Sequence, residues 1–229
     1  MALLTLTFRQ EKVELPEPSA RTCPARGYKI PEGLSGESLS LARLYADYGE
    51  VIEEQCRLNG LEAAAALAVM KVEAGGVGAF DQQSGLAVIR VEARPPILSQ
   101  VRYPHGEDEF RDQYGRGQSA EWRALADWFS REGEKACYWT SFGLGQIMGF
   151  NHGLVNCAKP VEVMLRAQSS AAESAKMFFD FVKAQKIIPA LGAKDWLAFA
   201  KVYNGAGNAQ GYAERISGVY NEARSLGLG

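Results

Sequence analysis

The sequence predicts a mostly α domain of the α+β class, with a small β-hairpin or sheet. From Ser38 onward, apolar residues recur at three- and four-residue steps over most of the chain, which is the period of an α-helix. One segment, residues 86–91, is instead rich in β-branched residues and resembles a strand. With 229 residues, 47% of them hydrophobic, the chain is long enough to bury a substantial core.

Local signals set the limits of the helices. The first helical pattern closes at Asn59-Gly60, because glycine is the common residue after a helix C-terminus. Residues 61–72 are Ala-rich and apolar on nearly all sides, which predicts a buried helix that ends at Glu73. Further helices are expected over 121–131, 160–183, 195–203 and 211–226.

Turn and strand chemistry follows the helix that ends at Glu73. Asp81–Gly85 predicts a turn, and Leu86–Val91 predicts the strand of a hairpin or sheet that ends at Pro95 and Pro96. Residues 102–118 are polar and contain glycine, which predicts a surface loop.

We expect residues 1–35 to form an N-terminal extended arm and residues 36–229 to form the helical domain. Leu4, Leu6 and Phe8 alternate with polar residues and predict one short strand. Four prolines then exclude a long helix before Gly36.

Charge and hydropathy restrict the partners and the location. The net charge of -2 favours neither nucleic acid nor a membrane surface as a partner, and a monomer is expected. No run of about 18 apolar residues suggests a transmembrane helix. The N-terminus lacks the apolar core of a signal peptide, so synthesis in the cytoplasm is expected. Release to another compartment would then require a separate route.

The four cysteines are scattered and the chain has two histidines. This spacing argues against zinc, and we expect neither a metal nor an organic cofactor. Four cysteines allow three disulfide pairings, but the missing signal peptide favours reduced thiols.

Glu73 is the first candidate catalytic residue. It ends a strongly apolar helix, where burial of an ionised carboxylate is costly. Desolvation raises the pKa of a carboxyl group, so Glu73 is expected to keep its proton near neutral pH and act as a general acid. The alternative is an ordinary helix-terminal glutamate that faces water.

Glu92 is the second candidate. Strand alternation places Val88, Arg90, Glu92 and Arg94 on one face, and the arginines are expected to keep Glu92 ionised. Two carboxyl groups with pKa values pushed apart are the usual acid and base of glycoside hydrolysis. The alternative is a salt bridge within the strand.

The Gly-rich segment 139–150 is a candidate binding region. Its glycines would each cost about 1 kcal/mol in a helix, whereas they allow a ligand to approach the backbone closely. Gln146 can donate and accept hydrogen bonds, as sugar hydroxyl groups require. Trp139, Phe142 and Phe150 offer flat faces on which pyranose rings could lie. The alternative is a tight packing turn. Tyr203-Asn204-Gly205 ends a later helix and is by itself an ordinary C-cap.

Three segments together resemble the N-acetylmuramidase domain of phage endolysins, a branch of the lysozyme superfamily. They are Glu73-Ala-Gly-Gly76, Ser141-Phe-Gly-Leu-Gly-Gln-Ile-Met-Gly-Phe-Asn-His152 and Tyr203-Asn-Gly205. The resemblance covers residues 40–225, with a more distant similarity to soluble lytic transglycosylases and goose-type lysozymes. It departs from the family at Ala74, where a polar residue is usual, and at Ala93–Pro96, where a basic residue, histidine and aromatics are common.

The resemblance implies a lysozyme-like fold and hydrolysis of the β-1,4 bond between N-acetylmuramic acid and N-acetylglucosamine in bacterial peptidoglycan. Glu73 would be the acid, and Glu92 would activate water or stabilise the cation. The assignment of two catalytic carboxyl groups follows the known arrangement of lysozyme itself, so this assignment rests on the resemblance. Residues that would position the sugar or shape the cleft are Gln146, Tyr203, Asn204, Trp139, Ser141 and Phe142.

Two other functions remain open. A lytic transglycosylase would use one carboxyl group and form an anhydro-muramic product, whereas a silent relative would only bind glycan. The enzyme would act in the periplasm or cell wall, either as an endolysin released through a holin or as a toxin exported by a secretion machine. A toxin would require an immunity protein as a partner.

Overall fold

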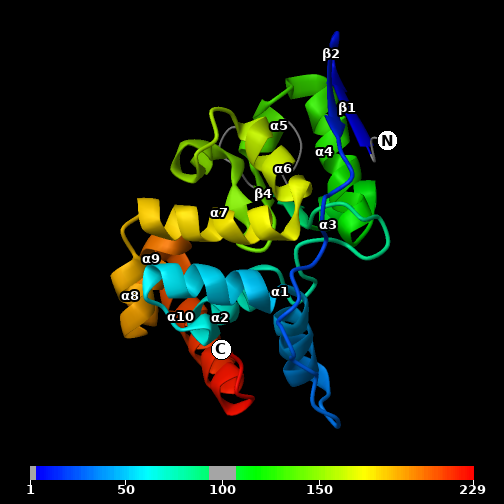
Figure 1. The fold of residues 1–229 in the computed structure, drawn as a ribbon. Helices are drawn as coiled ribbons and strands as arrows, with labels where there is room; N and C mark the ends of the chain where they lie inside the picture. Colours follow the sequence, from blue (N-terminus) through cyan, green and yellow to red (C-terminus); the bar gives the residue numbers. More distant parts are fainter. Residues whose placement is uncertain (1–3, 93–106) are drawn as a thin grey trace.

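The computed structural model describes residues 4–92 and 107–229, which form a mostly helical molecule with two small antiparallel sheets (Figure 1). The β1–β2 hairpin lies next to α4 at one end of the molecule, and α10 lies at the other. The α-helices in this part of the chain are α1 (Gly36–Asn59), α2 (Ala63–Glu73), α3 (Glu107–Tyr114), α4 (Gln118–Glu132), α5 (Lys135–Tyr138), α6 (Pro160–Ser169), α7 (Ala171–Ala184), α8 (Ile188–Ala193), α9 (Trp196–Tyr203) and α10 (Ala209–Ser225). Short 3-10 helices are η1 (Gly149–Val155) and η2 (Ala206–Asn208).

Helix α2 is the centre of the core. Every residue from Ala63 to Lys71 is buried, as the all-round apolar pattern predicts. Four consecutive alanines let α1 and α10 pack closely against it. Glu73 is the last residue of this helix, so the fold of α2 carries a carboxyl group to the edge of the core.

The predicted small sheet is confirmed, but the strand that pairs with residues 89–91 lies far along the sequence. Strand β3 (Ile89–Val91) pairs antiparallel with β4 (Thr140–Phe142), which pairs with β5 (Ile147–Met148). The turn at 81–85 is closed by hydrogen bonds from Asp81 N to Leu86 O and from Gly85 N to Asp81 O, and by an isolated bridge between Phe80 and Ala87. The Gly-rich segment therefore forms two of the three strands, beside the end of α2.

The N-terminal segment folds back as a hairpin before it becomes extended. Strand β1 (Leu4–Phe8) pairs with β2 (Glu11–Leu15), so the expected single strand is one of two. The following segment is bonded to the domain, because Ser19 N donates to Ser169 O at 2.8 Å and Cys23 N donates to Asp47 O at 2.7 Å. The domain boundary near residue 35 remains a prediction.

Two helix predictions need correction. Residues 107–114 of the expected loop form α3, whereas residues 102–106, like Pro95 and Pro96, lie outside the described residues. The single helix expected over 160–183 is two helices, because Ser170 is extended at φ -170°. Its hydroxyl accepts a hydrogen bond from Glu173 N and caps α7.

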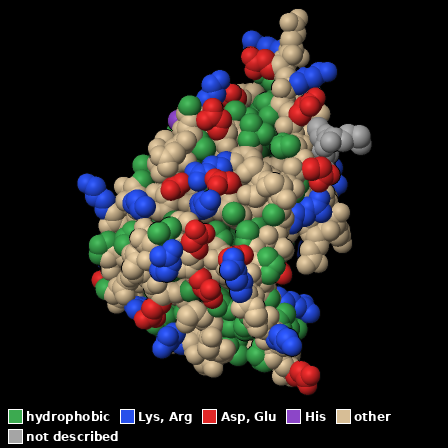
Figure 2. All heavy atoms as spheres, in the orientation of Figure 1, with side chains coloured by type: hydrophobic (Ala, Val, Ile, Leu, Met, Phe, Trp, Pro, Cys, Tyr) green, Lys and Arg blue, Asp and Glu red, His purple; other side chains and the backbone are tan. Residues whose placement is uncertain are grey.

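The surface and the thiols are ordinary for a globular domain. Basic and acidic side chains are interspersed over the face seen in Figure 2, in line with the net charge of -2. All four cysteines are free. Within residues 4–92 and 107–229, no helix has both the length and the hydrophobicity needed to span a membrane.

Candidate active site

A pocket of about 360 Å³ lies where the end of α2 meets the sheet, α9 and α10. It brings together six of the eight residues singled out in the sequence, from four separate parts of the chain. These six are Glu73, Glu92, Ser141, Gln146, Tyr203 and Asn204. Other side chains on its wall include Arg90, Asn151, Phe181, Tyr212 and Arg215.

Glu73 has the environment expected of a general acid. Its Oε1 atom is buried and has no hydrogen-bond partner in the described part of the chain. Burial raises the pKa of Glu73 from 4.5 to about 8, the charge of Glu92 adds to the increase, and Arg215 opposes it. The carboxyl group therefore keeps its proton at neutral pH and can donate it in the pocket.

This pKa makes the stability of the protein depend on pH. In the unfolded chain Glu73 ionises near pH 4.5, whereas in the folded protein it keeps its proton up to about pH 8. Between these values the folded state binds the extra proton, so its stability falls as pH rises. We expect the free energy of unfolding of the wild type, relative to Glu73→Gln, to fall by up to a few kcal/mol across this window. Urea denaturation at several pH values measures it, and a pH-independent difference would contradict the assignment.

Glu92 directly follows β3, and its backbone N–H donates to Trp139 O at 3.2 Å. Its side chain is half-buried, and burial raises its pKa while Arg90 opposes the increase. Desolvation outweighs Arg90, so the pKa of Glu92 is raised; that the flanking arginines keep Glu92 ionised stays a prediction. Arg94 lies outside the described residues.

Ser141, Gln146 and Tyr203 use their polar groups to hold the 143–146 turn in place. Gln146 Nε2 donates to Gly143 O at 2.8 Å, and Gln146 Oε1 accepts from Ser141 Oγ at 2.9 Å. Tyr203 Oη donates to Gly145 O at 2.6 Å, and its ring stacks on Phe199. These side chains therefore form a rigid wall, and Asn204 lies exposed at its edge.

The glycines of segment 139–150 serve internal packing rather than the approach of a ligand. A Cβ atom on Gly149 would lie 2.0 Å from the carbonyl oxygen of Cys137. One on Gly143 would lie 2.4 Å from Ser174 Oγ, and one on Gly145 3.0 Å from Phe178 Cβ. The alternative of a tight packing turn, which the sequence left open, is thus the correct one for these three positions.

None of the three aromatic residues whose flat faces were expected to meet the sugar, Trp139, Phe142 and Phe150, lines this pocket. Phe142 is 0% exposed in β4 and belongs to the core, so its ring offers no face to a ligand. Trp139, which directly precedes β4, packs its ring against those of Tyr138 and Phe150. Its contribution to the pocket is its carbonyl oxygen, which fixes the backbone of Glu92.

Sequence reasoning missed two residues of α10. Tyr212 and Arg215 line the pocket three residues apart on one helix face. The signal was weak, because a tyrosine and an arginine at this spacing are common on any amphipathic helix. Only the packing of α10 against α2 places them beside Glu73.

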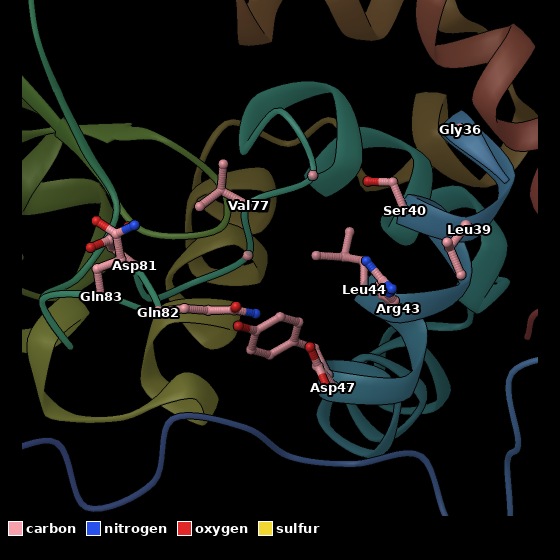
Figure 3. A pocket seen from close by; sticks show the side chains of 13 residues that line it. Gly36, Leu39, Ser40, Arg43, Leu44, Asp47, Val77, Asp81, Gln82 and Gln83 are labelled. Atoms are coloured by element: carbon pink, nitrogen blue, oxygen red, sulfur yellow. The ribbon is translucent and has the colours of Figure 1, made fainter. Parts of the chain in front are cut away.

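A second pocket, of about 370 Å³, lies between α1 and residues 76–83 (Figure 3). It contains Asp47 and Asp81, but Asp81 Oδ2 already accepts hydrogen bonds from Ser84 N and Ser84 Oγ. Asp47 has a pKa raised by burial and opposed by Arg43. Since neither Glu73 nor Glu92 reaches this pocket, the first pocket is the candidate active site.

Among the residues placed by the structure, no group of three His, Cys, Asp or Glu side chains could hold an ion.

A lysozyme-like fold with a buried, protonated glutamate and a second carboxyl group in one pocket defines a site of the glycoside hydrolase class. The chain belongs to the N-acetylmuramidase family, whose sequence model matches residues 62–224. Its structure is similar to the crystal structure of the Burkholderia AP3 phage endolysin, with a TM-score of 0.59 and 26% sequence identity over 78% of this chain and 71% of that chain. A comparison with curated proteins gave no match.

Proposed function

We propose that the protein hydrolyses the β-1,4 bond between N-acetylmuramic acid and N-acetylglucosamine in peptidoglycan. Membership of the muramidase family and the likeness to a phage endolysin support peptidoglycan hydrolysis in general. The observation that carries the specific mechanism is the pocket in which Glu73, protonated at neutral pH, faces the same space as Glu92.

Glu73 donates its proton to the glycosidic oxygen as the bond from that oxygen to the sugar carbon breaks. The leaving sugar takes the proton, and positive charge develops on the remaining sugar ring. Glu92, as a carboxylate, stabilises this charge or removes a proton from the water that adds to the ring. Glu73 then regains a proton from solvent.

The two carboxyl groups need opposite protonation states. The charge of Arg90 favours the ionised form of Glu92, although burial raises its pKa overall. Activity requires Glu92 to be ionised and Glu73 to be protonated. The pKa of Glu73, about 8, therefore sets the upper end of the pH range in which the protein is active. The rigid wall of Ser141, Gln146 and Tyr203 holds the sugar ring between the carboxyl groups, and Asn204 borders the opening.

The test is digestion of purified peptidoglycan by the wild type and by Glu92→Gln, with the products identified by mass spectrometry. We expect reducing muramic ends from the wild type and at least about a 100-fold slower release from the variant. Anhydro-muramic ends, lighter by one water and still produced by Glu92→Gln, would instead identify a lytic transglycosylase. Binding to the wall without any release would identify a glycan-binding protein.

In its biological setting we propose that the protein acts on the cell wall as an endolysin, as a monomer whose partner is peptidoglycan. The similarity to a phage endolysin supports this role over that of an exported toxin with an immunity protein. Release through a holin would then deliver it to the periplasm. Expression targeted to the periplasm should lyse cells, whereas cytoplasmic expression should not.

A further inference from the structure

We infer that Tyr212 and Arg215 form a site that binds a carboxylate attached to the muramic acid residue, and thereby distinguish peptidoglycan from uncharged glycans. This inference rests on the proposed function, because it names the part of the substrate that the pocket wall on α10 recognises. It concerns two residues that take no part in the chemical step described above.

Arg215 lies at a junction of two pockets. It lines the pocket of Glu73 and also an adjoining pocket of about 400 Å³, and both include Val72. A substituent on a sugar bound near Glu73 would therefore pass Arg215 as it leaves the catalytic pocket. The side chain is exposed, so a ligand can reach its guanidinium group.

The guanidinium group is held in place but makes no ion pair within the described residues. Its central carbon lies 5.4 Å from the centre of the Tyr212 ring, a cation–π contact that limits its motion. Nearby Lys71, in contrast, is neutralised by Glu37 at 2.6 Å. Arg215 is thus a positioned cation with free donors, and guanidinium donors match the two oxygens of a carboxylate.

Tyr212 provides an independent observation. The residue is 3% exposed and lines the catalytic pocket, and its hydroxyl group has no hydrogen-bond partner among the residues placed by the structure. A buried hydroxyl without a partner costs about 1–3 kcal/mol, so an acceptor from a ligand would be favourable. Tyr212 therefore offers an unpaired hydroxyl group to the pocket, and the guanidinium group of Arg215 lies over its ring.

The neighbouring carboxyl groups do not fill this site. Glu73 is protonated at neutral pH and carries no charge that would hold Arg215. Glu214 accepts a hydrogen bond from Gln210, and Glu37 pairs with Lys71. A carboxylate of the substrate would also cancel the charge of Arg215, which removes an influence that lowers the pKa of Glu73.

The chemistry of the substrate supplies such a carboxylate on one of its two sugars. Muramic acid carries a lactyl ether whose carboxyl group is either free or joined to a peptide with carboxylates of its own, and N-acetylglucosamine carries neither. Recognition of this carboxylate would place muramic acid, rather than its neighbour, on the α10 side of the pocket.

The experiment compares wild type and Arg215→Gln on intact peptidoglycan and on peptidoglycan whose carboxylates have been converted to amides. On intact material the variant should lose about 10- to 100-fold in kcat/KM, the worth of a hydrogen bond to a charged group. Amidation should reduce the wild-type rate by a similar factor and leave the variant nearly unchanged. Equal effects of amidation on both proteins would exclude the carboxylates of the peptide and leave the free lactyl group as the only remaining ligand of the site.

Variants on the same helix sharpen the result. Tyr212→Phe, which removes only the hydroxyl group, should lose about 2- to 10-fold on intact peptidoglycan. The controls Arg224→Gln and Tyr220→Phe lie outside the pocket linings and should retain wild-type rates; an equal loss in the controls would count against a specific site.

A third substrate identifies the source of the carboxylate. Glycan strands stripped of their peptides carry only the free lactyl group. A penalty for Arg215→Gln confined to intact material assigns the site to the peptide, and a penalty on stripped strands assigns it to the lactyl group. No penalty on either overturns the inference. A wild type that releases no saccharide at all would instead refute the proposed function itself.

Discussion

Replacing Glu73 by glutamine should lower the rate of saccharide release by about 100- to 10,000-fold, the usual contribution of a general acid. The amide has nearly the same shape as the protonated carboxyl group but cannot deliver a proton to the glycosidic oxygen. Release of soluble saccharides from peptidoglycan measures the loss.

The loss of activity in Glu73→Gln should not be accompanied by a loss of stability. Because Glu73 Oε1 is buried without a partner, a neutral amide should leave the free energy of unfolding at pH 7 equal or higher. The matched control is Glu54→Gln, an exposed glutamate of α1, which should be fully active. A Glu73→Gln protein that kept more than about one tenth of the wild-type rate would exclude Glu73 as the acid.

The second large effect is structural. Gly149→Ala should destabilise the protein by about 3 kcal/mol, because its Cβ atom would lie 2.0 Å from the Cys137 carbonyl oxygen. That oxygen belongs to the backbone of α5, just before β4, so it cannot move without displacing the strand that carries Ser141. Urea denaturation measures the loss of stability.

Gly153→Ala is the matched control for this substitution. Gly153 lies in the same 3-10 helix, η1, and a Cβ atom there would meet nothing within 4 Å. Its effect on the free energy of unfolding should stay within about 0.5 kcal/mol, as for a surface substitution. Similar effects at the two positions would show that helix propensity, rather than the backbone contact, limits the segment.

The sequence was sufficient where the signal is local. Gly60, predicted to end the first helix, has the left-handed conformation of a C-cap with φ 66°. The all-round apolar pattern correctly predicted a buried helix ending at Glu73. Six of the eight predicted site residues line one pocket, although their roles in catalysis and binding remain proposals.

What the sequence did not reveal depends on tertiary packing. The pairing of β3 with β4 joins segments separated by α3 to α5, and no turn signal announces it. Alternation cannot tell which face of a strand meets the core, so Phe142 was expected in the cleft and lies in the interior. The pKa of Glu92 depends on burial, which outweighs the adjacent arginine visible in the sequence.

The extended N-terminal segment has a consequence for how the enzyme works. Ser19 and Ala20 are bonded to the junction of α6 and α7, while Cys23 and Ala25 are bonded to α1. Residues 19–25 therefore link α1, which packs against the helix that carries Glu73, to α6 and α7, which pack against the small sheet. This link resists any movement that would separate these helices. We expect the spacing of the two carboxyl groups, which decides whether a glycosidase retains or inverts the sugar configuration, to be fixed before substrate arrives. The folded protein itself, rather than a closure around the bound glycan, would then determine the stereochemistry of the reaction.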